Sequence, residues 1–281
     1  MEHLRQGVLF LLRWMCYTVS RMLKGERNHM RDEMSLVGKT ALVTGGGTGL
    51  GLGIARELAD LGAAVILAGR REQVLREAVD QVPGSAYRTL DLTKLEELDA
   101  FVAKLWADFG TVDILVNNAG IQNNKPALTF TDDEVQAMFQ THVFGAYRLT
   151  CSIARRLMDA GKPGSVVFIS SSAAHMGLTN TAAYTGAKGA VSALCRSLSS
   201  EFAPHGIRVN AVCPGWIETE LVKESLRRVP ERRAMVEHRC LVPGLGTEKD
   251  VGMAVAFLAS DAARYITAAE LKVDGGVAVS L

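Results

Sequence analysis

The sequence lacks the features that mark several specialised classes of protein. Its five cysteines are odd in number and far apart, with no Cys-x-x-Cys pair. That spacing argues against a disulfide framework and a zinc site, and it favours a reducing, cytoplasmic compartment. The formal net charge is only +1, which gives no reason to expect a nucleic acid partner. No repeat, low-complexity tract or Pro/Gly/Ser-rich linker divides the chain, so we expect one globular domain.

The sequence of residues 1–33 differs from the rest and has the pattern of a basic amphipathic extension. Wound as a helix, they place Arg13 and Lys24 on one side and Leu11 and Met15 on the other. The apolar run is too short to span a bilayer, because Arg13 interrupts it. Three interpretations stay open: a helix lying on a membrane surface or on a partner subunit, a transit peptide, or an extension without a role ahead of a usual start at Met34.

The remainder of the chain has the pattern of an α/β protein. Hydrophobic residues make up 48% and charged residues 22% of the 281 positions, enough apolar surface for a large core. Short apolar runs alternate with longer helical patterns, which is typical of βαβ units around a parallel sheet. The expected strands are Thr40–Thr44, Ala64–Ala68, Tyr87–Leu90, Val112–Val116, Val166–Ile169, Ile207–Val212 and Leu271–Val273. Long helices are expected over about 131–160 and 182–203, and the domain over residues 35–281.

A possible proton donor occurs in the stretch from Tyr184 to Lys188. On a helix, positions i and i+4 share one face, so the Lys188 ammonium would lie beside the Tyr184 phenol. A nearby cation favours phenolate and lowers the phenol pKa from about 10 toward neutrality, as general acid/base chemistry requires. The hydroxyls of residues 170–172 lie a short way upstream. Taken alone, Tyr-x-x-x-Lys also occurs by chance on ordinary amphipathic helices.

A glycine-rich segment between the first strand and the first helix predicts a dinucleotide site. In Thr44–Gly51, the residues Gly45, Gly49 and Gly51 let the backbone turn tightly and approach a pyrophosphate at the helix N-terminus. The second strand is followed by Arg70 and Arg71, where an NAD-preferring site has an acidic residue. Arginines at this point can pair with a 2′-phosphate. We therefore predict NADP(H) rather than NAD(H) as the cofactor.

From about residue 36 to its end, the chain resembles the short-chain dehydrogenase/reductase family. The resemblance rests on motifs that occur in order: Thr44–Gly51, Asp91-Leu92, Asn117-Asn118-Ala119-Gly120, Ser171, Tyr184-x-x-x-Lys188, Pro214-Gly215 and Asp274-Gly275-Gly276. The family's serine stands thirteen positions before its tyrosine, which selects Ser171 from its neighbours. The resemblance implies a Rossmann fold with a doubly wound sheet. Among relatives, 3-oxoacyl-[acyl-carrier-protein] reductases and sugar or gluconate dehydrogenases are the most similar in general pattern.

By this resemblance, the chain interconverts a ketone and a secondary alcohol by hydride transfer. Ser171 would bind the substrate carbonyl, Tyr184 would exchange the proton, and Lys188 would lower the tyrosine pKa and bind the nicotinamide ribose. The implied cofactor contacts are Gly45, Thr48, Gly49, Leu50, Gly51, Arg70, Arg71, Asp91, Leu92, Asn117, Ala119, Gly120, Tyr184, Lys188, Pro214, Gly215, Ile217 and Thr219. For Asn117, support of the central strands is an alternative role.

Two positions depart from the family pattern. His142 stands where most relatives carry an asparagine that holds a helix distortion and a water feeding protons to the lysine. A neutral histidine has both a donor and an acceptor, so His142 is a candidate catalytic residue whose proton supply would change around pH 6 to 7. Weakened turnover and a plain packing role are the alternatives. The second departure is Ala268-Ala269, where relatives often carry glycine before the last strand.

The substrate is the least determined feature. In this family it is bound largely by the segment after Pro214-Gly215, here about residues 216–246, which is rich in charge. Those charges indicate either a solvated helical lid or recruitment of an acidic carrier or phosphorylated substrate. Relatives commonly form tetramers through the two long helices, so a homo-oligomer is expected. Two further hypotheses are a non-catalytic NADP(H)-binding regulator and a membrane-associated reductase of lipid-like ketones.

Overall fold

A seven-stranded parallel sheet forms the centre of the molecule, as predicted. The computed structural model describes residues 12, 15, 33–228, 236 and 238–280. The strand order is β3-β2-β1-β4-β5-β6-β7, and every adjacent pair is parallel. The strands are β1 (Thr40–Thr44), β2 (Ala64–Gly69), β3 (Ala86–Thr89), β4 (Ile114–Asn117), β5 (Gly164–Ile169), β6 (Ile207–Pro214) and β7 (Glu270–Val273). The predicted α/β fold class is therefore confirmed.

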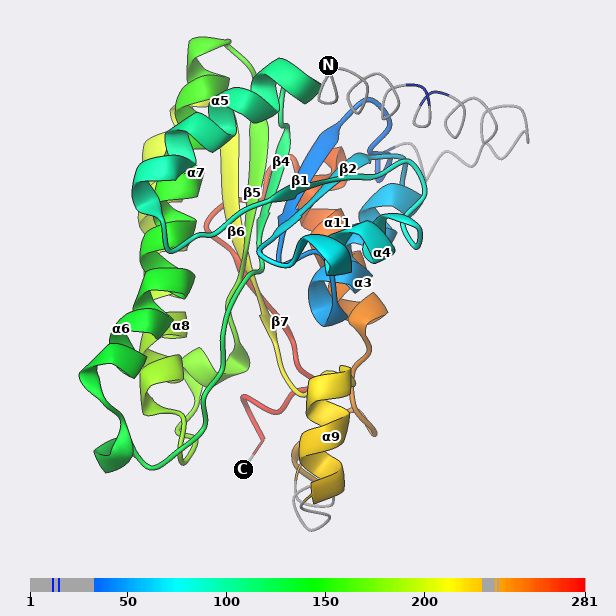
Figure 1. Cartoon of the computed structure of the whole chain (residues 1–281). Coiled ribbons are helices and arrows are strands. Elements are labelled where there is room, and N and C mark those ends of the chain that lie inside the picture. Colours follow the sequence, from blue (N-terminus) through cyan, green and yellow to red (C-terminus); the bar gives the residue numbers. More distant parts are fainter. Residues whose placement is uncertain (1–11, 13–14, 16–32, 229–235, 237, 281) are drawn as a thin grey trace.

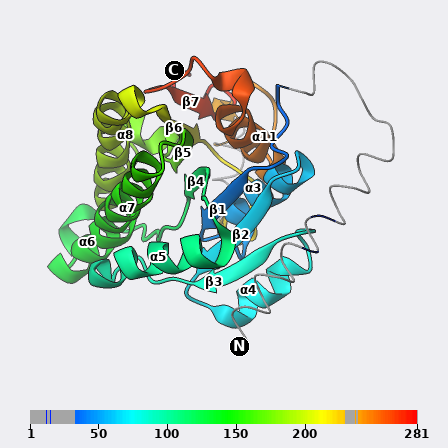
Figure 2. The same ribbon diagram turned by 90° about the horizontal axis from the view of Figure 1, so that it is seen from above.

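Helices cover both faces of this sheet (Figure 1). One layer contains α3 (Gly49–Asp60), α4 (Glu72–Val79) and α11 (Glu248–Ala259), and the other contains α5 (Leu98–Phe109), α7 (Ala146–Asp159) and α8 (Ala182–Phe202). Viewed from above, the two layers lie on opposite sides of the strands (Figure 2). Because both faces are covered, the central strands are apolar along their whole length rather than alternating, and β1, β2 and β5 are almost entirely buried.

The strand order places a crevice at the carboxyl ends of β1 and β4. After β1 the chain moves outward to β2 and β3, then returns to β4 on the other side of β1 and continues in the opposite direction. The loops that follow β1 and β4 therefore leave in opposite directions. Open α/β sheets bind ligands at such a switch point, so the fold by itself points to this edge.

The long helix predicted over residues 131–160 is interrupted in the structure. It begins as α6 (Asp132–Phe139), capped by a reciprocal pair of hydrogen bonds between Thr131 and Glu134. A π-helical turn, Gln140–Gly145, follows, and α7 continues from Ala146. Such turns hold an extra residue and are frequent at functional sites. Periodicity indicated the helix but not this turn, which buries the side chain of His142.

Shorter elements complete the fold. The 3₁₀ turns are Leu95–Glu97, Ala127–Thr129, Ser172–His175, Ala203–His205 and Asp261–Ala263. After β6 comes α9 (Glu220–Arg228), which projects beyond the sheet at the bottom of Figure 1. Of the predicted extension 1–33, all but residues 12, 15 and 33 lie outside the described residues. Within the described part of the chain, no helix has the length and apolar character needed to cross a membrane.

The second departure noted in the sequence has a structural consequence at Ala268. Its φ of 61° lies in the left-handed region, where a Cβ atom costs about 1–2 kcal/mol. The backbone N–H of Ala268 donates to the Val209 carbonyl at 2.8 Å, so pairing with β6 holds this conformation. Glycine adopts the same conformation without that cost, at the expense of a more flexible unfolded chain.

We expect Ala268→Gly to raise the free energy of unfolding by about 1 kcal/mol, measured by urea denaturation at fixed protein concentration. Ala269→Gly is the matched control, because Ala269 does not have a positive φ and glycine there should lower stability by about 0.5–1 kcal/mol. Equal destabilisation by both changes would mean that the left-handed geometry at Ala268 is not strained.

Candidate active site

A cavity of about 850 Å³ lies at the carboxyl edge of the sheet, within the size range of small-molecule sites. Every site residue predicted from the sequence lines it, with Asn117 as the exception. The predicted residues that line it are Gly45, Thr48, Gly49, Leu50, Gly51, Arg70, Arg71, Asp91, Leu92, Ala119, Gly120, His142, Ser171, Tyr184, Lys188, Pro214, Gly215, Ile217 and Thr219. Motifs up to 174 positions apart in the chain thus converge on one space.

Asn117 does not line the cavity, and its side chain bonds to helix α7 instead. Its side chain is buried, and its Nδ2 donates to the Thr150 hydroxyl on α7 at 2.9 Å. The next residue, Asn118, lines the cavity instead, because successive side chains point to opposite sides of an extended chain. Its Nδ2 donates to the carbonyls of Thr44 and Gly45 at 2.9 and 3.3 Å. Asn118 was not among the predicted contacts, although its place in the same motif could have indicated it.

The glycine-rich loop packs closely against the segment that follows β4. A Cβ added to Gly51 would overlap with the Gly45 carbonyl oxygen and lie 2.5 Å from the Asn118 side chain. Thr44 fixes the start of the loop, since its hydroxyl accepts from the backbone N–H groups of Asn118 and Ala119 at 3.0 and 3.1 Å. The absence of a side chain at Gly51 therefore lets the start of α3 approach the end of β1, and its absence at Gly45 lets the loop approach Ala119 after β4.

The N-terminus of α3 opens toward the cavity. Its N-cap residue, Thr48, makes no side-chain capping hydrogen bond, and Thr48, Gly49 and Leu50 all line the cavity. The first N–H groups of a helix have no partners within the helix, and the helix dipole gives this end a partial positive charge. Backbone donors and a positive end suit the negative pyrophosphate of a dinucleotide. The geometry and charge of this loop therefore fit a dinucleotide.

Positive charge also marks the far end of the cavity. Arg70 and Arg71 follow β2, are exposed, and line the cavity together with Asp91 from the segment after β3. Burial acts to raise the pKa of Asp91, but two hydrogen bonds from Thr93 and the charge of Arg70 outweigh it, so the net pKa is lowered. An ionised Asp91 that is fixed by Thr93 can accept hydrogen bonds from a ligand.

At the other end of the cavity, Tyr184 and Ser171 meet. Ser171 follows β5, and its Oγ accepts from the Ala173 backbone at 3.1 Å. Burial raises the pKa of Tyr184, and a hydrogen bond with Ser171 opposes this rise only partly. The sequence predicted a lowered phenol pKa, whereas the structure raises it. Desolvation exceeds the effect of that hydrogen bond, so the pKa stays raised and Tyr184 is a protonated phenol at neutral pH.

Lys188 is buried one turn further along α8. Its ammonium donates to the Ile169 carbonyl at 2.7 Å and lies 5.7 Å from the centre of the Tyr184 ring. Burial lowers the pKa of Lys188 to about 8, so the group carries its charge at pH 7 but loses it at alkaline pH. Ser170, which the sequence left as a neighbour, also lines the cavity, and its hydroxyl donates to the Lys188 carbonyl at 3.1 Å.

His142 lies between these groups and the loop after β4. Its ring meets the Tyr184 ring edge to face at 5.7 Å, and Nε2 lies 3.1 Å from the Ile121 nitrogen and 2.7 Å from its oxygen. Burial, followed by the charge of Lys188, lowers the His142 pKa to about 3. The sequence-based expectation of a proton supply that changes near pH 6 to 7 is therefore wrong, because desolvation keeps the imidazole neutral throughout that range.

A buried neutral histidine makes stability depend on pH. The unfolded chain protonates His142 below its ordinary pKa of 6.5, whereas the folded protein does so only near 3. The stabilisation is complete above pH 6.5 and is lost as the pH falls toward 3. We expect His142→Asn to remove this dependence, so that the variant loses about 2 kcal/mol less than the wild type between pH 7 and pH 5.

Urea denaturation at the two pH values measures this difference, with the exposed His205 changed to Asn as the control. If the parent and His142→Asn lose equal stability between pH 7 and 5, the histidine titrates normally in the folded state. The kinetic profile is a separate readout. Because His142 stays neutral, the pH profile of kcat/KM should show no step near pH 6.5 that depends on this residue. The profile of His142→Asn should therefore match that of the parent in this range.

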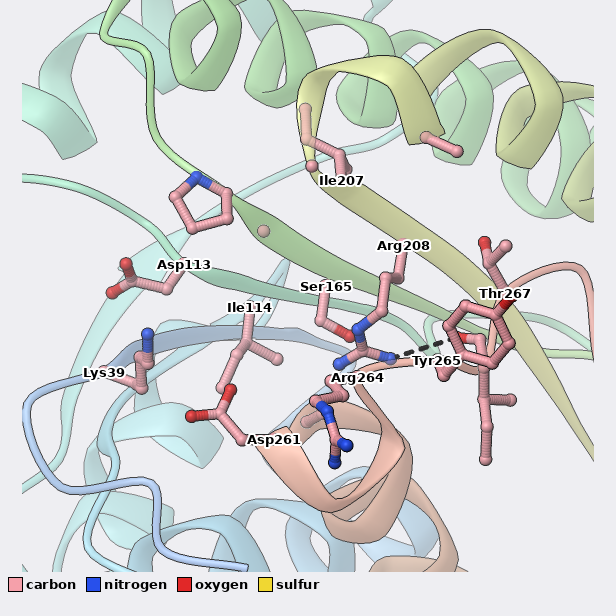
Figure 3. Close-up of a pocket in the computed structure, with 16 residues that line it drawn as sticks. Lys39, Asp113, Ile114, Ser165, Ile207, Arg208, Asp261, Arg264, Tyr265 and Thr267 are labelled. Atoms are coloured by element: carbon pink, nitrogen blue, oxygen red, sulfur yellow. Dashed lines mark hydrogen bonds between the residues drawn. The ribbon is translucent and has the colours of Figure 1, made fainter. Parts of the chain in front are cut away.

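A second cavity, of about 590 Å³, lies at the opposite edge of the sheet (Figure 3). It is lined by the side chains of Lys39, Asp113, Arg208 and Arg264, among others. The Arg208 guanidinium is engaged there, donating to the carbonyls of Leu258 and Ser260 at 2.7 and 3.2 Å. This edge has neither the glycine-rich loop nor a buried proton donor. The glycine-rich loop, Tyr184 and Lys188 all lie at the carboxyl edge, which also has the larger of these two cavities.

Comparison with known proteins gives the family. A family model described as enoyl-(acyl carrier protein) reductase matches residues 45–278, which includes the glycine-rich loop, Tyr184 and Lys188. The chain belongs to the short-chain dehydrogenase/reductase family. A chloroplastic tropinone reductase homolog of Arabidopsis thaliana is 37% identical, over 89% of this chain and 79% of that protein. The 3-oxoacyl-[acyl-carrier-protein] reductase of Chlamydia muridarum is 34% identical, over 86% and 98%.

Solved structures of other short-chain dehydrogenases/reductases agree with the fold. A gluconate 5-dehydrogenase from Burkholderia cenocepacia, crystallised with NADP and tartrate, superposes with a TM-score of 0.85 at 30% identity, covering 90% of this chain and all of the other. The predicted resemblance is thus confirmed. As a member of this family, the chain is an oxidoreductase of the class that acts on CH–OH groups and their carbonyl products.

Proposed function

We propose that this short-chain dehydrogenase/reductase interconverts a small-molecule ketone and a secondary alcohol with NADP(H). The observation that carries the proposal is the convergence of Ser171, Tyr184 and Lys188 on the cavity that also contains the glycine-rich loop. The nicotinamide of bound NADPH supplies the hydride for reduction. Two arginines at the adenosine end and a proton donor at the other give the cavity the polarity that such a ligand and reaction need.

In this proposal, the residues of the chain handle the carbonyl oxygen. Ser171 Oγ donates to the oxygen, and Tyr184 gives its phenolic proton as negative charge develops there. Burial keeps Tyr184 protonated before the reaction, which is the state that reduction requires. The Lys188 ammonium, held by Ile169, stabilises the phenolate left behind. The ketone gains a hydride and a proton and becomes the alcohol, and the oxidation runs through the same steps in reverse.

His142 takes a positioning role in this scheme. Because it is neutral, it cannot supply protons by changing its charge, but its ring is packed against Tyr184 and hydrogen-bonded to the backbone of Ile121. A Cβ on Gly120 would lie 2.9 Å from His142 Nδ1, so the ring fills the space beside that glycine. The π-helical turn that relatives hold with asparagine is held here by a larger, buried residue.

A cofactor-oxidation screen tests the function. Purified protein with NADPH is offered acetoacetyl thioesters, keto sugars, steroids and simple ketones, and consumption of NADPH is followed by absorbance. Reduction of at least one ketone class is expected. Binding of NADPH without turnover of any class would instead favour the non-catalytic regulator.

Reduction of acetoacetyl thioesters would agree with the 3-oxoacyl-[acyl-carrier-protein] reductases, and oxidation of gluconate with the gluconate dehydrogenases.

Helix α9 gives little support for recruitment of an acidic carrier. Lys223 pairs with Glu220 at 3.2 Å and Arg227 with Glu224 at 3.7 Å, so these cations are matched on an exposed helix. The basic residues at 232 and 233 lie outside the described residues. We therefore favour a small, uncharged or hydroxylated carbonyl compound as substrate.

Cofactor preference depends on Arg70 and Arg71. We expect the double variant Arg70→Ala, Arg71→Ala to raise the KM for NADPH by roughly 10–100-fold and to leave the KM for NADH unchanged, because charge-assisted hydrogen bonds contribute about 1.5–3 kcal/mol. Arg76→Ala, on the exposed face of α4, removes a similar charge outside the cavity and serves as the control. A parent enzyme that uses NADH as efficiently as NADPH would contradict the preference.

We further propose that the chain forms homo-oligomers, tetramers by analogy with its relatives. Helix α7 and the π-helical turn before it expose Phe144 and Tyr147 at 47% and 44%, and apolar side chains of this size on neighbouring turns suit a subunit interface. The basic extension 1–33 remains a proposed separate segment. Light scattering gives the oligomeric state, and liposome binding by the full chain against a Met34-start protein tests the membrane hypothesis.

A further inference from the structure

Three potential metal ligands meet outside the active-site cavity. His175, Cys213 and Glu270 each offer one ligand atom, and these atoms all lie within 4.8 Å of one another. His175 Nε2 lies 2.9 Å from Glu270 Oε2 and 3.8 Å from Cys213 Sγ. None of the three residues lines the cavity at the carboxyl edge. The dehydrogenase chemistry proposed above therefore leaves this cluster without a role.

The fold brings these residues together from three separate elements. Cys213 lies near the end of β6, and Glu270 begins β7 opposite Ala211, two residues before Cys213 on the same face of the sheet. His175 ends the 3₁₀ turn Ser172–His175 that follows β5. The ligands are far apart in the sequence, which explains why the cysteine spacing alone argued against a zinc site.

The two oxygens of the Glu270 carboxylate lie in different surroundings. Oε1 pairs with Arg196 on α8, which holds the group in place. Oε2 is buried and makes no hydrogen bond, despite its closeness to His175 Nε2. A buried carboxylate oxygen without a hydrogen bond is costly. A cation between the imidazole, the thiol and this oxygen would satisfy it.

We propose that His175, Cys213 and Glu270 bind a Zn²⁺ ion, with water as the fourth ligand. In a tetrahedral zinc site, bond lengths of about 2.0–2.3 Å place the ligand atoms roughly 3.3–3.6 Å apart. The two distances given above bracket that range and the third pair of ligand atoms lies within 4.8 Å, so side-chain shifts of roughly 1–1.5 Å would complete the geometry. A thiolate combined with an imidazole selects zinc over Mg²⁺ or Ca²⁺, which prefer oxygen ligands alone.

Access and proton balance are consistent with this assignment. The His175 side chain is 30% exposed, so an ion can enter from solvent past the imidazole. On binding, a Zn–S bond forms and the Cys213 thiol releases its proton to solvent, while the imidazole binds through its unprotonated nitrogen. No electron is transferred, and no other reactant is needed. The bound ion would join β6, β7 and the turn that follows Ser171.

Zinc binding to the full chain tests the proposal without reference to activity. Purified protein, stripped with a chelator, is titrated with Zn²⁺ in competition with a chromophoric chelator, and separately with Co²⁺. We expect one ion per chain at this site, a thiolate-to-cobalt charge-transfer band, and a higher melting temperature with zinc. Cys213→Ser should abolish the band, and both Cys213→Ser and His175→Gln should weaken Zn²⁺ binding by at least about 100-fold.

Cys151→Ser provides the matched control, because Cys151 is a free, partly buried cysteine on α7 outside the cluster. It should leave affinity and the cobalt band unchanged. Wild-type zinc affinity in both Cys213→Ser and His175→Gln, or cobalt binding without a thiolate band, would overturn the assignment. His175→Gln alters a partly exposed side chain, so it keeps the test decisive even if the buried Cys213→Ser variant does not fold. The outcome is independent of whether NADPH is oxidised.

Discussion

Tyr184→Phe is expected to lower kcat for ketone reduction by roughly 10²–10⁴-fold, the usual contribution of a positioned general acid. The change removes only the phenolic oxygen. The ring that packs edge to face against His142 is kept, so the fold and the affinity for NADPH should be little changed. Steady-state oxidation of NADPH with any ketone that the parent reduces gives the first quantity, and fluorescence titration with NADPH gives the second.

The matched control is Tyr265→Phe, because Tyr265 is 99% exposed and lies at the opposite edge of the sheet. It should be as active as the parent. If Tyr184→Phe kept most of the parent kcat, another group would be donating the proton, and the proposed role of Tyr184 would have to be abandoned. Loss of NADPH affinity together with kcat would instead indicate a structural role for the hydroxyl that bonds to Ser171.

The second large effect is expected from Gly51→Ala. The added methyl group would overlap with the Gly45 carbonyl oxygen and press on the Asn118 side chain, which forces the glycine-rich loop away from the end of β4. A displacement of about 1 Å at a binding site can cost about 10²-fold. We therefore expect affinity for NADPH to fall by about that factor, measured by fluorescence or calorimetric titration.

Gly177→Ala makes the same substitution at a site where an added Cβ meets nothing within 4 Å, and it should bind NADPH normally. Circular dichroism shows whether Gly51→Ala still folds, and the affinity is interpreted only for folded protein. Undiminished affinity in that protein would show that the close approach of β1 and α3 is not needed for the cofactor. The two variants together separate the effect of a methyl group from the effect of its position.

Much of this architecture follows from local sequence patterns. All seven strands were expected near their observed positions. The central strands are continuous apolar runs bounded by glycine and polar turns, whereas the edge strands β3 and β7 are short and only partly buried. The cavity residues were found largely through ordered motifs whose spacing the fold requires. Gly45 lies far from Tyr184 and Lys188 in the chain, but the three converge at one edge because parallel strands end together.

The remaining features depend on tertiary surroundings, and the sequence could not reveal them. The His142 pKa is low because the side chain is buried beside Lys188, which no local pattern records. The phenol of Tyr184 has a raised rather than lowered pKa because desolvation exceeds the effect of its hydrogen bond with Ser171. Asn117, an expected cofactor contact, bonds to α7, while its neighbour Asn118 lines the cavity, because side chains alternate at the end of β4. The cluster of His175, Cys213 and Glu270 exists only after β6 and β7 have paired.

The link between Thr44 and Asn118 joins residues 74 positions apart in the chain. The first βαβ unit can therefore emerge and collapse during synthesis well before its neighbour in the sheet, β4, has been made. Pairings over such sequence distances are slow to form, because the intervening chain must first lose its freedom. We therefore expect the nucleotide crevice to form late in folding. A nascent chain that stops short of β4 has the glycine-rich segment but lacks the strand and loop against which that segment packs.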